Sequence, residues 1–511
     1  MAEQKKGSML NASARDGVEY RKAPLWALIM SQANNGTGIA FYMMMTMVTY
    51  IGVQGYGIAS VAVGVIAMCM RIFDGFTDAL ISAAFEKMNP KYPKIRIFVL
   101  GGWAIAALGI ILMYNLAAGK FSGVAGMIIF IIIWVFYLMG YTINGMGGGV
   151  CGIVITNDPT QRPMMGLIST IFSYGVPLLG NNFITFFILP RHDNQYDVPM
   201  LGELCIFWAV VSLIFAIICC IGVKDVDNAE VFATAGGAGK SGGAVKWSDI
   251  VAVLTSNKNT QRYFWTCISD KFAQTMASYS VVTTMLSGVL IGSYAATTWV
   301  GNFSTPISFG FTFLGAMYVA KFGAKQSTVV WSWASIILKS IMVIYCLILG
   351  PQGMSKIGVF GPYLIFYGLL TMAVTAVSMI LTVTGNTMRA DVVDYELDRS
   401  GNYFPAVLAG VYNFVAKLTD SVTNVVVTAC IALIGYVNTV PQKGDPAIWK
   451  VLIMTMIIAN GLPIIGWIIN LLAMKNYDLT KEEMVEIAKR NAARKEAMKA
   501  AAEAPKAEDA E

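Results

Sequence analysis

Long apolar stretches recur along the whole of this 511-residue chain, and they limit its fold more than any other feature. Each covers about 20 residues or more, which as a helix rising about 1.5 Å per residue crosses roughly 30 Å of hydrocarbon. Apolar residues make up 56% and charged residues 13% of the chain, whereas soluble domains are about 25% charged. The stretches lack the alternation of barrel strands. We therefore predict an all-α polytopic membrane protein with about 12 transmembrane helices.

Lysine and arginine residues outside the predicted spans are distributed unevenly. If both termini are cytoplasmic, most of them lie on that side, and the other side keeps Lys120, Arg191, Lys356, Lys443 and Lys450. Such a bias sets orientation by the positive-inside rule. We therefore expect a multi-pass protein of the cell inner (plasma) membrane with both termini cytoplasmic. The net charge of +6 then reflects contact with anionic membrane lipid, and no nucleic acid partner is expected.

A polar stretch rich in glycine and alanine, ATAGGAGKSGGAVKWSD, interrupts the apolar pattern near the middle of the chain. This composition is typical of a flexible connection. We expect a cytoplasmic N-terminus, an N-terminal bundle of about six helices, a cytoplasmic linker, a C-terminal bundle of about six helices and a cytoplasmic tail, as in the major facilitator architecture. Their predicted ranges are 1–24, 25–223, 224–261, 262–474 and 475–511. The tail is expected to begin with a solvated helix and end in an acidic tip.

Several charged residues fall inside predicted spans, where each costs at least ~2.5–3.5 kcal/mol and usually has a task. In RIFDGFTDAL, Arg71, Asp74 and Asp78 share one helix face, and Thr77 lies between the two acids. Their depth along the span predicts that they meet the hydroxyl of Thr142 near the middle of the membrane. Hard cations prefer oxygen ligands, so we predict a site for Na⁺ or H⁺ formed by these acids and hydroxyls.

A purely structural interpretation of the same charges is also open. Arg71 then neutralises Asp74 within one helix, and Lys417 neutralises Asp420 within another. This interpretation leaves Asp78 without a partner, and a buried carboxylate with no function is a net cost. We therefore favour the cation site, with Lys417 as a charge that competes with the cation for the carboxylates.

Three segments resemble the glycoside-pentoside-hexuronide:cation symporters, the family typified by the melibiose permease. They are RIFDGFTDAL, YTINGMGGGVCGIVITNDPTQR and ADVVDYELDRSGNYFPAVLAGVYNFVAKLTD, and the resemblance extends from about Asn34 to Tyr477. It implies a major facilitator fold and a secondary active transporter that carries a sugar or glycoside together with a cation.

The resemblance also assigns roles to residues of this chain. The family's cation-binding aspartates fall on Asp74 and Asp78, and its threonine falls on Thr142, so these three residues are the candidate Na⁺ ligands. Its lysine falls on Lys417, which is expected to couple cation to substrate together with Arg71. Thr77 stands where the family has asparagine, so an oxygen ligand of another type is present.

The substrate side departs from the melibiose branch. The acidic, aromatic and arginine side chains that hold the sugar there correspond to Asn35, Gly145, Gly149 and Thr170 here. We therefore expect a glycoside other than melibiose, such as a glucuronide or another substituted glycoside. Glycines at 145–149 either widen the pocket or allow close helix packing, and both interpretations remain open.

Four residues are the candidate substrate ligands: Asn34, Asn35, Tyr141 and Trp299. Asparagine both donates and accepts hydrogen bonds, as a hydroxyl-rich ligand requires. Tyr141 is equally well explained as a packing aromatic.

Other classes of function fit less well. The only histidine, His192, falls in a predicted outward loop, and no nucleophile–base pair is evident, so the chain is not expected to be an enzyme. The eight cysteines form no CxxC motif, and no cofactor is expected. A cation-coupled carrier of an amphiphile such as a lysolipid, and a membrane sensor that does not transport, are the remaining alternatives.

Overall fold

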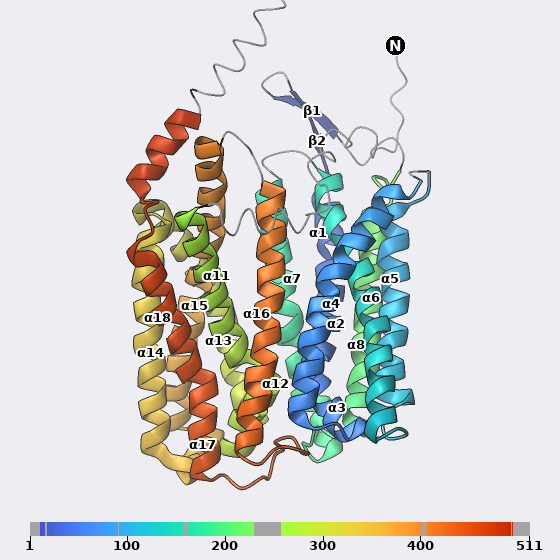
Figure 1. Ribbon diagram of the computed structural model, residues 1–511, viewed down its shortest axis with the longest axis vertical. Helices are drawn as coiled ribbons and strands as arrows, with labels where there is room; N and C mark the ends of the chain where they lie inside the picture. The colour runs from blue at the N-terminus through green and yellow to red at the C-terminus, as the bar shows by residue number, and fades with distance from the viewer. Residues whose placement is uncertain are drawn as a thin grey trace, which may run out of the picture. The chain divides into compact units, whose positions relative to one another are not determined.

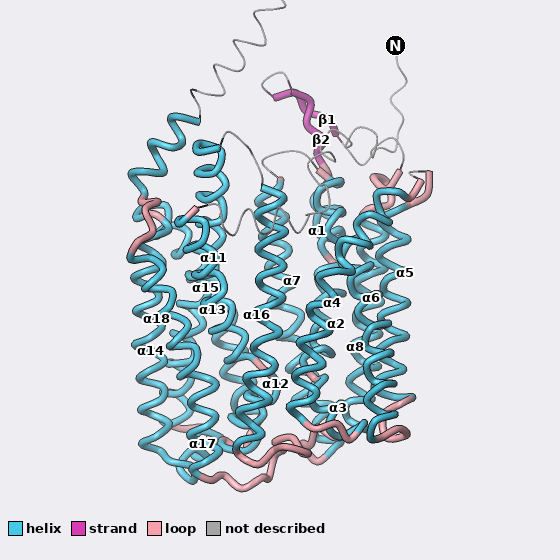
Figure 2. Tube along the Cα trace, viewed as in Figure 1, coloured by secondary structure: helices cyan, strands magenta, loops and turns pink. Residues whose placement is uncertain are grey.

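The computed structural model describes residues 11–15, 18–89, 91–156, 161–228, 257–400, 405–491 and 493. Nearly all of them are helical, which confirms the predicted all-α membrane fold (Figure 2). They divide into two compact units (Figure 1). The first unit takes its described residues from Met1–Ala244, Tyr279–Trp299 and Ser421–Met454, and the second from Val245–Ser278, Val300–Asp420 and Thr455–Glu511.

The elements of the first unit are β1 (Asn11–Arg15), β2 (Val18–Lys22), α1 (Leu25–Gln32), α2 (Asn34–Thr46), α3 (Val48–Tyr56), α4 (Ser60–Lys87), α5 (Lys94–Ile111), η1 (Leu112–Leu116), α6 (Gly123–Ile155), α7 (Arg162–Phe183), η2 (Ile184–Ile188), η3 (Leu189–His192), α8 (Val198–Gly222), α12 (Ser280–Thr284) and η4 (Met285–Leu290). The second unit holds α11 (Lys258–Ser278), α14 (Ala324–Gly353), η5 (Met354–Gly358), α15 (Pro362–Ser400), η6 (Ile457–Gly461) and α18 (Leu462–Lys475). Residues of both units occur in α13 (Tyr294–Phe322), α16 (Pro405–Leu433) and α17 (Trp449–Met456).

Among the described residues, 10 helices are long and apolar enough to cross a membrane, or 11 if the bent helix pair Leu25–Thr46 and Val48–Tyr56 is one span. The predicted span over 262–292 differs from the others. It consists of α11, a break at Tyr279 with extended backbone, and the short helices α12 and η4. The helix α11 carries Lys258, Arg262, Asp270 and Lys271 and is not apolar enough to count among these spans, so sequence and structure differ by this one segment.

Two strands, β1 and β2, precede the first helix and were not predicted. They pair antiparallel, with Asn11 opposite Lys22 and Arg15 opposite Val18 (Figure 2, magenta). This pair lies in the N-terminal segment expected to be polar, before the first apolar helix, so the membrane-spanning architecture is unaffected.

The predicted linker, 224–261, lies mostly outside the described residues, and the predicted bundle boundaries stay a prediction. Its first residues are described and have a structural task. The Asp227 carboxylate accepts hydrogen bonds from the backbone N–H groups of Ile95 and Arg96, each at 3.0 Å, and from Arg96 Nε at 3.2 Å. A carboxylate at the first turn of α5 satisfies N–H groups that have no partner within the helix.

Glycines bring α5 and α6 into close contact. A Cβ built on Gly140 would lie 2.2 Å from the backbone nitrogen of Ala106, and one built on Gly102 would lie 2.3 Å from that of Asn144. No side chain fits at such distances, so only glycine allows this approach. The contact fixes the position of α6, the helix that carries Thr142.

The C-terminal tail packs against the second unit, whereas the sequence predicted a solvated appendage. Residues 481–491 are helical as expected. However, Tyr477, Leu479 and Ile487 are almost fully buried in one cluster with residues of α11, α15 and α16. Arg490 adds an ion pair with Asp398 at 2.9 Å. The apolar positions of the tail therefore mark a packed face.

We expect Ile487→Ala to lower the free energy of unfolding of the second unit by about 2–5 kcal/mol, because a fully buried side chain is removed. Val485 is 48% exposed on the same helix, so Val485→Ala should change stability by less than about 0.5 kcal/mol. Thermal unfolding of the purified protein measures both. If both variants change the stability equally, the tail is a solvated appendage and not a packed helix.

Candidate functional site

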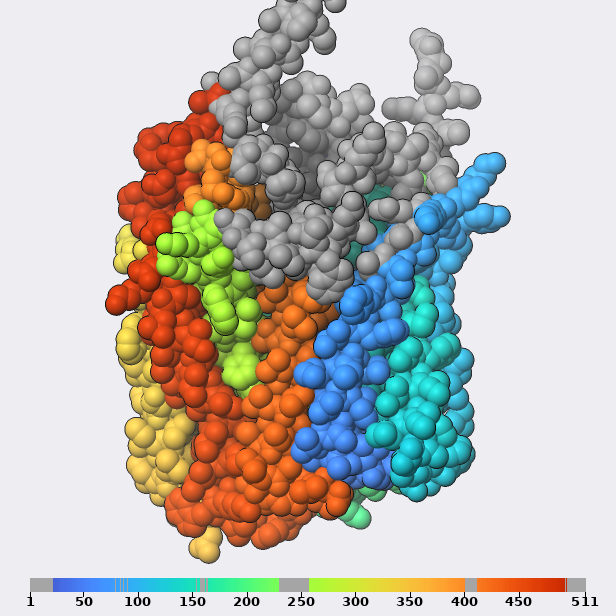
Figure 3. Space-filling model, viewed as in Figure 1, coloured from blue at the N-terminus to red at the C-terminus, as the bar shows by residue number. Residues whose placement is uncertain are grey.

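A buried carboxylate on α4 is the centre of the candidate site. Asp74 is 0% exposed, and its Oδ1 accepts a hydrogen bond of 2.7 Å from the Thr142 hydroxyl on α6. Thr142 Oγ1 also lies 3.0 Å from the Leu138 carbonyl oxygen, so its single hydrogen has two alternative acceptors. Figure 3 shows α4 (blue) and α6 (cyan) side by side on one face of the first unit. The structure thus brings together two residues that lie far apart in the sequence.

The other predicted residues of α4 surround this carboxylate. Arg71 Nη1 lies 3.9 Å from Asp74 Oδ2, at the outer limit of an ion pair. Thr77 is buried, and its hydroxyl donates to the backbone carbonyl of Asp74 at 2.9 Å. Asp78 is half-buried one helical turn further along. Because the Thr77 hydroxyl donates its hydrogen within its own helix, its oxygen can bind a ligand only through a lone pair.

Two tyrosines near Arg71 were not predicted. The Arg71 guanidinium carbon lies 5.9 Å from the centroid of the Tyr42 ring. The charge of Arg71 also acts on Tyr279, whose hydroxyl pairs with that of Thr49 at 2.9 Å. Both tyrosines belong to the first unit. The sequence offered no signal for Tyr42, which is one aromatic residue in an apolar helix, and the break at Tyr279 was not predicted.

Tyr141 lies beside the carboxylates. The charges of Arg71, Asp74 and Asp78 all act on its hydroxyl. Its ring also packs against that of Tyr137, with centroids 6.4 Å apart. The position of Tyr141 therefore agrees with a role as a substrate ligand and with a role as a packing aromatic.

Asn34 takes part in helix packing, and its role as a substrate ligand stays a prediction. It is 6% exposed, and its Nδ2 lies 3.2 Å from both the carbonyl oxygen and the side-chain oxygen of Asn144 on α6. Asn144 Nδ2 in turn donates to the Val99 carbonyl on α5 at 2.8 Å. Buried amides thus join the three helices α2, α6 and α5. Asn144 was not singled out from the sequence, although an amide inside an apolar span indicates a polar contact.

Asn35 and Trp299 occupy different surroundings. Asn35 is half-buried and donates to Gln32 Oε1 at 3.1 Å, one turn earlier in the chain. Trp299 is 52% exposed, and its ring centroid lies 5.7 Å from that of Phe186. Their predicted roles as substrate ligands stay predictions.

The glycines of α6 divide into two kinds. Gly147 and Gly148 allow close packing, because a Cβ on Gly148 would lie 2.1 Å from Asn34 Nδ2 and one on Gly147 would lie 3.0 Å from Val99. A Cβ on Gly145 or Gly149 would meet nothing within 4 Å. These two exposed glycines lie three and seven residues after Thr142, on the same side of the helix. Close packing therefore holds for Gly147 and Gly148, whereas a widened pocket at Gly145 and Gly149 stays a prediction.

Lys417 belongs to the second unit, where it is half-buried on α16. An interaction between Lys417 and Asp74 stays a prediction. Asp420, its partner in the structural interpretation, accepts a hydrogen bond from Thr275 Oγ1 at 3.0 Å and lies 3.6 Å from Lys271 Nζ. The Asp420 charge is therefore shared with α11.

The arrangement on α4 and α6 suits a hard monovalent cation. Among the described residues, no three His, Cys, Asp or Glu side chains gather as a transition metal would require. Two carboxylates one turn apart and a threonine hydroxyl supply oxygen ligands only. The donor set therefore fits Na⁺, or a proton on one of the two acids.

Comparison with known proteins identifies the family of the chain. A family model described as MFS/sugar transport protein matches residues 31–481. The chain belongs to this family. The family includes melibiose-permease-like carriers, so the resemblance seen in the sequence is confirmed. The chain is accordingly a multi-pass membrane transporter of the major facilitator type, a class that contains transporters and not enzymes.

Solved structures share the fold. The nucleoside transporter NupG is 13% identical with a TM-score of 0.57, covering 88% of this chain and 99% of that chain. A POT family transporter in complex with 5-aminolevulinic acid is 11% identical with a TM-score of 0.58, covering 91% and 98%. The inward-open xylose transporter XylE from E. coli is 13% identical with a TM-score of 0.51, covering 91% and 98%. No curated protein matches the chain significantly. At these identities the structures establish the major facilitator fold alone.

Proposed function

We propose that this chain is a secondary active transporter that carries a sugar or glycoside together with Na⁺ or H⁺ by alternating access. The observation that carries the proposal is the fully buried Asp74 carboxylate, held at 2.7 Å by the Thr142 hydroxyl of a second helix. A carboxylate buried in a span is costly unless a positive charge compensates it, and Arg71 at 3.9 Å can balance only one of the two acids, Asp74 and Asp78. Membership of a sugar transport family supports a sugar as the cargo.

The coupling follows from electrostatics. Asp74 and Asp78 repel each other while no cation or proton lies between them. A cation removes this repulsion and draws α4 and α6 together at Thr142, next to Tyr141. Because Tyr141 and the uncovered side of α6 at Gly145 and Gly149 form the proposed substrate wall, cation binding orders the substrate pocket.

The substrate is proposed to be a glycoside other than melibiose, such as a glucuronide. Gly145 and Gly149 carry no side chain that could replace the sugar-binding groups of the melibiose branch. Both open onto free space, which leaves room for a substituted glycoside. Localisation in the cell inner membrane with cytoplasmic termini is part of the same proposal.

A flux screen in proteoliposomes tests the function. Na⁺ and pH indicators inside the vesicles report cation entry after addition of phenyl glucuronide, melibiose or lysophosphatidylcholine. We expect cation entry with the glucuronide, or with another substituted glycoside in a wider panel, and no saturable entry with melibiose. Entry driven only by the lysolipid would contradict the proposal in favour of an amphiphile carrier. Glycoside binding without any flux would contradict it in favour of a sensor.

Lys417 is proposed to link the cation to the substrate. We expect Lys417→Ala to lower cation-driven accumulation by about 5–150-fold, the range of a typical coupling energy, with little change in thermal stability. Lys450→Ala, at an exposed position on α17, is the control and should transport normally. Normal ion-driven accumulation by Lys417→Ala would assign this lysine a structural role only.

A further inference from the structure

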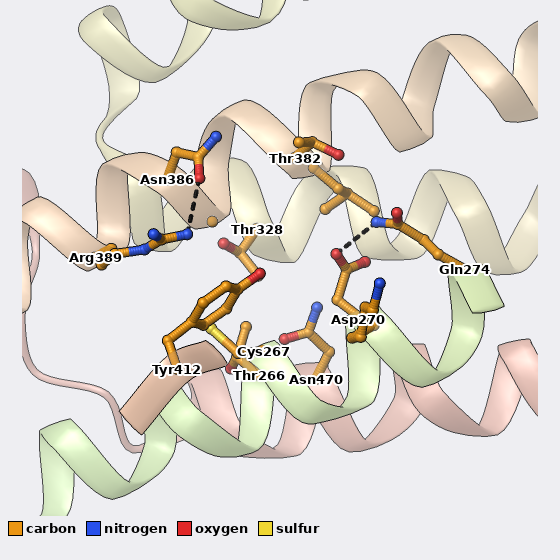
Figure 4. Close-up of a pocket in the computed structure, with 13 residues that line it drawn as sticks. Thr266, Cys267, Asp270, Gln274, Thr328, Thr382, Asn386, Arg389, Tyr412 and Asn470 are labelled. Atoms are coloured by element: carbon orange, nitrogen blue, oxygen red, sulfur yellow. Dashed lines mark hydrogen bonds between the residues drawn. The ribbon is translucent and has the colours of Figure 1, made fainter. Parts of the chain in front are cut away.

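A separate cavity lies inside the second unit. Its volume is about 160 Å³, and its walls come from α11, α14, α15, α16 and α18 (Figure 4). A cavity of this size has room for several waters or for a small organic ligand. None of its lining residues has a task in the proposed cation site.

One end of the cavity presents a positive charge. The Arg389 guanidinium carbon lies 4.1 Å from the centroid of the Tyr412 ring, and its Nη2 donates to Asn386 Oδ1 at 3.2 Å. Arg389 Nε is buried without a hydrogen bond of good geometry, and the Tyr263 hydroxyl lies beside the guanidinium. Within the part of the chain that the structure describes, Arg389 has no carboxylate partner. The ring and the amide therefore hold in place a guanidinium whose charge is not neutralised.

The other end presents acceptors. Asn470 is 1% exposed, and its Nδ2 donates to Ser332 Oγ at 3.1 Å while its Oδ1 has no partner. Asp270 accepts from Gln274 Nε2 at 2.8 Å and from Trp467 Nε1 at 3.3 Å. Each carboxylate oxygen has a further lone pair. Figure 4 shows Asp270 and Arg389 at opposite ends of the lining, with Asn470 on the wall near Asp270.

We infer that this cavity is a second binding site, for a small organic carboxylate that also carries hydroxyl or amine donors. The carboxylate would pair with Arg389, which offers the fork geometry that suits it. The donors would satisfy Asn470 Oδ1 and the free lone pairs of Asp270. Lys271 also lines the cavity, but Asp420 lies 3.6 Å from its Nζ, so Arg389 is the main anchor. A cavity of this size suits a small ligand, of about three or four carbons.

Gly385 provides a way to fill the cavity without disturbing the fold. It lines the cavity on α15, and a Cβ built on it would meet nothing within 4 Å. Leucine is also a much better helix former than glycine. Gly310 on α13 is a matched control, because its Cβ would also meet nothing within 4 Å and it does not line the cavity.

Calorimetry on the purified full-length protein tests the site, with D-glycerate, L-serine and glycerol as probes. We expect saturable binding of at least one of the two carboxylates and none of glycerol, which lacks the charge. Glycerate alone indicates hydroxyl donors, serine alone indicates an amine donor, and either supports the site. Gly385→Leu and Arg389→Gln should raise Kd at least about tenfold, and Gly310→Leu should leave it unchanged.

Three results would overturn the inference: no binding of either carboxylate, glycerol binding as tight as theirs, or an unchanged Kd in Gly385→Leu. If Arg389→Gln fails to fold, Gly385→Leu decides alone. Glycoside-driven cation flux, measured on the same preparations, reports separately on the proposed transport function.

Discussion

Asp74→Asn and Asp78→Asn are each expected to abolish the cation dependence of substrate accumulation while the protein stays folded. Asparagine keeps the shape of the side chain and can still accept a hydrogen bond from Thr142, but it removes the charge that binds the cation. Accumulation against a gradient should fall by about 5–150-fold, because the coupling energy between the two ligands is lost. Uptake of labelled glycoside into proteoliposomes, with and without an inward Na⁺ gradient, measures the effect.

The matched control is Asp193→Asn. Asp193 is an exposed loop residue with a φ of 51°, a left-handed conformation that asparagine also tolerates. This variant should transport like the wild type. If both α4 variants keep normal cation stimulation, the two acids have the structural role of balancing Arg71.

Gly140→Ala is expected to destabilise the first unit by about 3 kcal/mol, or to prevent folding, because the new methyl group overlaps backbone atoms of α5 that cannot move aside. Its Cβ would lie 2.2 Å from Ala106 N. A molecule that does fold must push α6 away from α5. The Thr142 hydroxyl, two residues further along, would then shift relative to Asp74, so cation affinity should fall as well.

Gly101→Ala separates this steric effect from the loss of a glycine. Gly101 is exposed on α5, and a Cβ there meets nothing within 4 Å. Alanine at this position should be neutral or stabilising by up to about 1 kcal/mol, because it favours the helix. Thermal unfolding and Na⁺ titration of both variants check the prediction. Equal stability of Gly140→Ala and Gly101→Ala would show that α5 and α6 do not need this close contact.

The sequence predicted the part of the site that rests on helix periodicity and on the cost of burying charge. Arg71, Asp74 and Asp78 share one face of α4 because residues three, four and seven apart must do so. Thr142 was expected at the same depth from a count of residues along its span, and it does contact Asp74. Both arguments need only local geometry, and local geometry is regular in a membrane helix.

Contacts between helices could not be predicted in the same way. The Asn34 amide nitrogen bonds Asn144 because the packing of α2 on α6 brings these two residues together, which sequence spacing does not indicate. The role of Asn34 as a substrate ligand stays a prediction. In the same way, only the position of α5 and α2 decides that Gly147 and Gly148 are covered while Gly145 and Gly149 are not. Sequence spacing identifies a face, and the neighbouring helix decides what that face meets.

The C-terminal tail illustrates the same limit. Its mixed charge and strong helix formers correctly predicted a helix, but they gave no sign of a partner. Leu479 and Ile487 are buried in one cluster with residues of α11 and α15, two helices that precede the tail by many residues in the sequence.

Isothermal titration of a transported glycoside into purified protein, with and without Na⁺ and at several pH values, tests the central claim most directly. Reciprocal linkage requires that the cation tightens glycoside binding by the same factor as the glycoside tightens cation binding, and we expect a factor of about 5–150 in the wild type. In Asp74→Asn and Asp78→Asn, the glycoside should still bind weakly, and its affinity should no longer depend on Na⁺ or pH. Equal cation stimulation of glycoside binding in the wild type and in both variants would contradict the account.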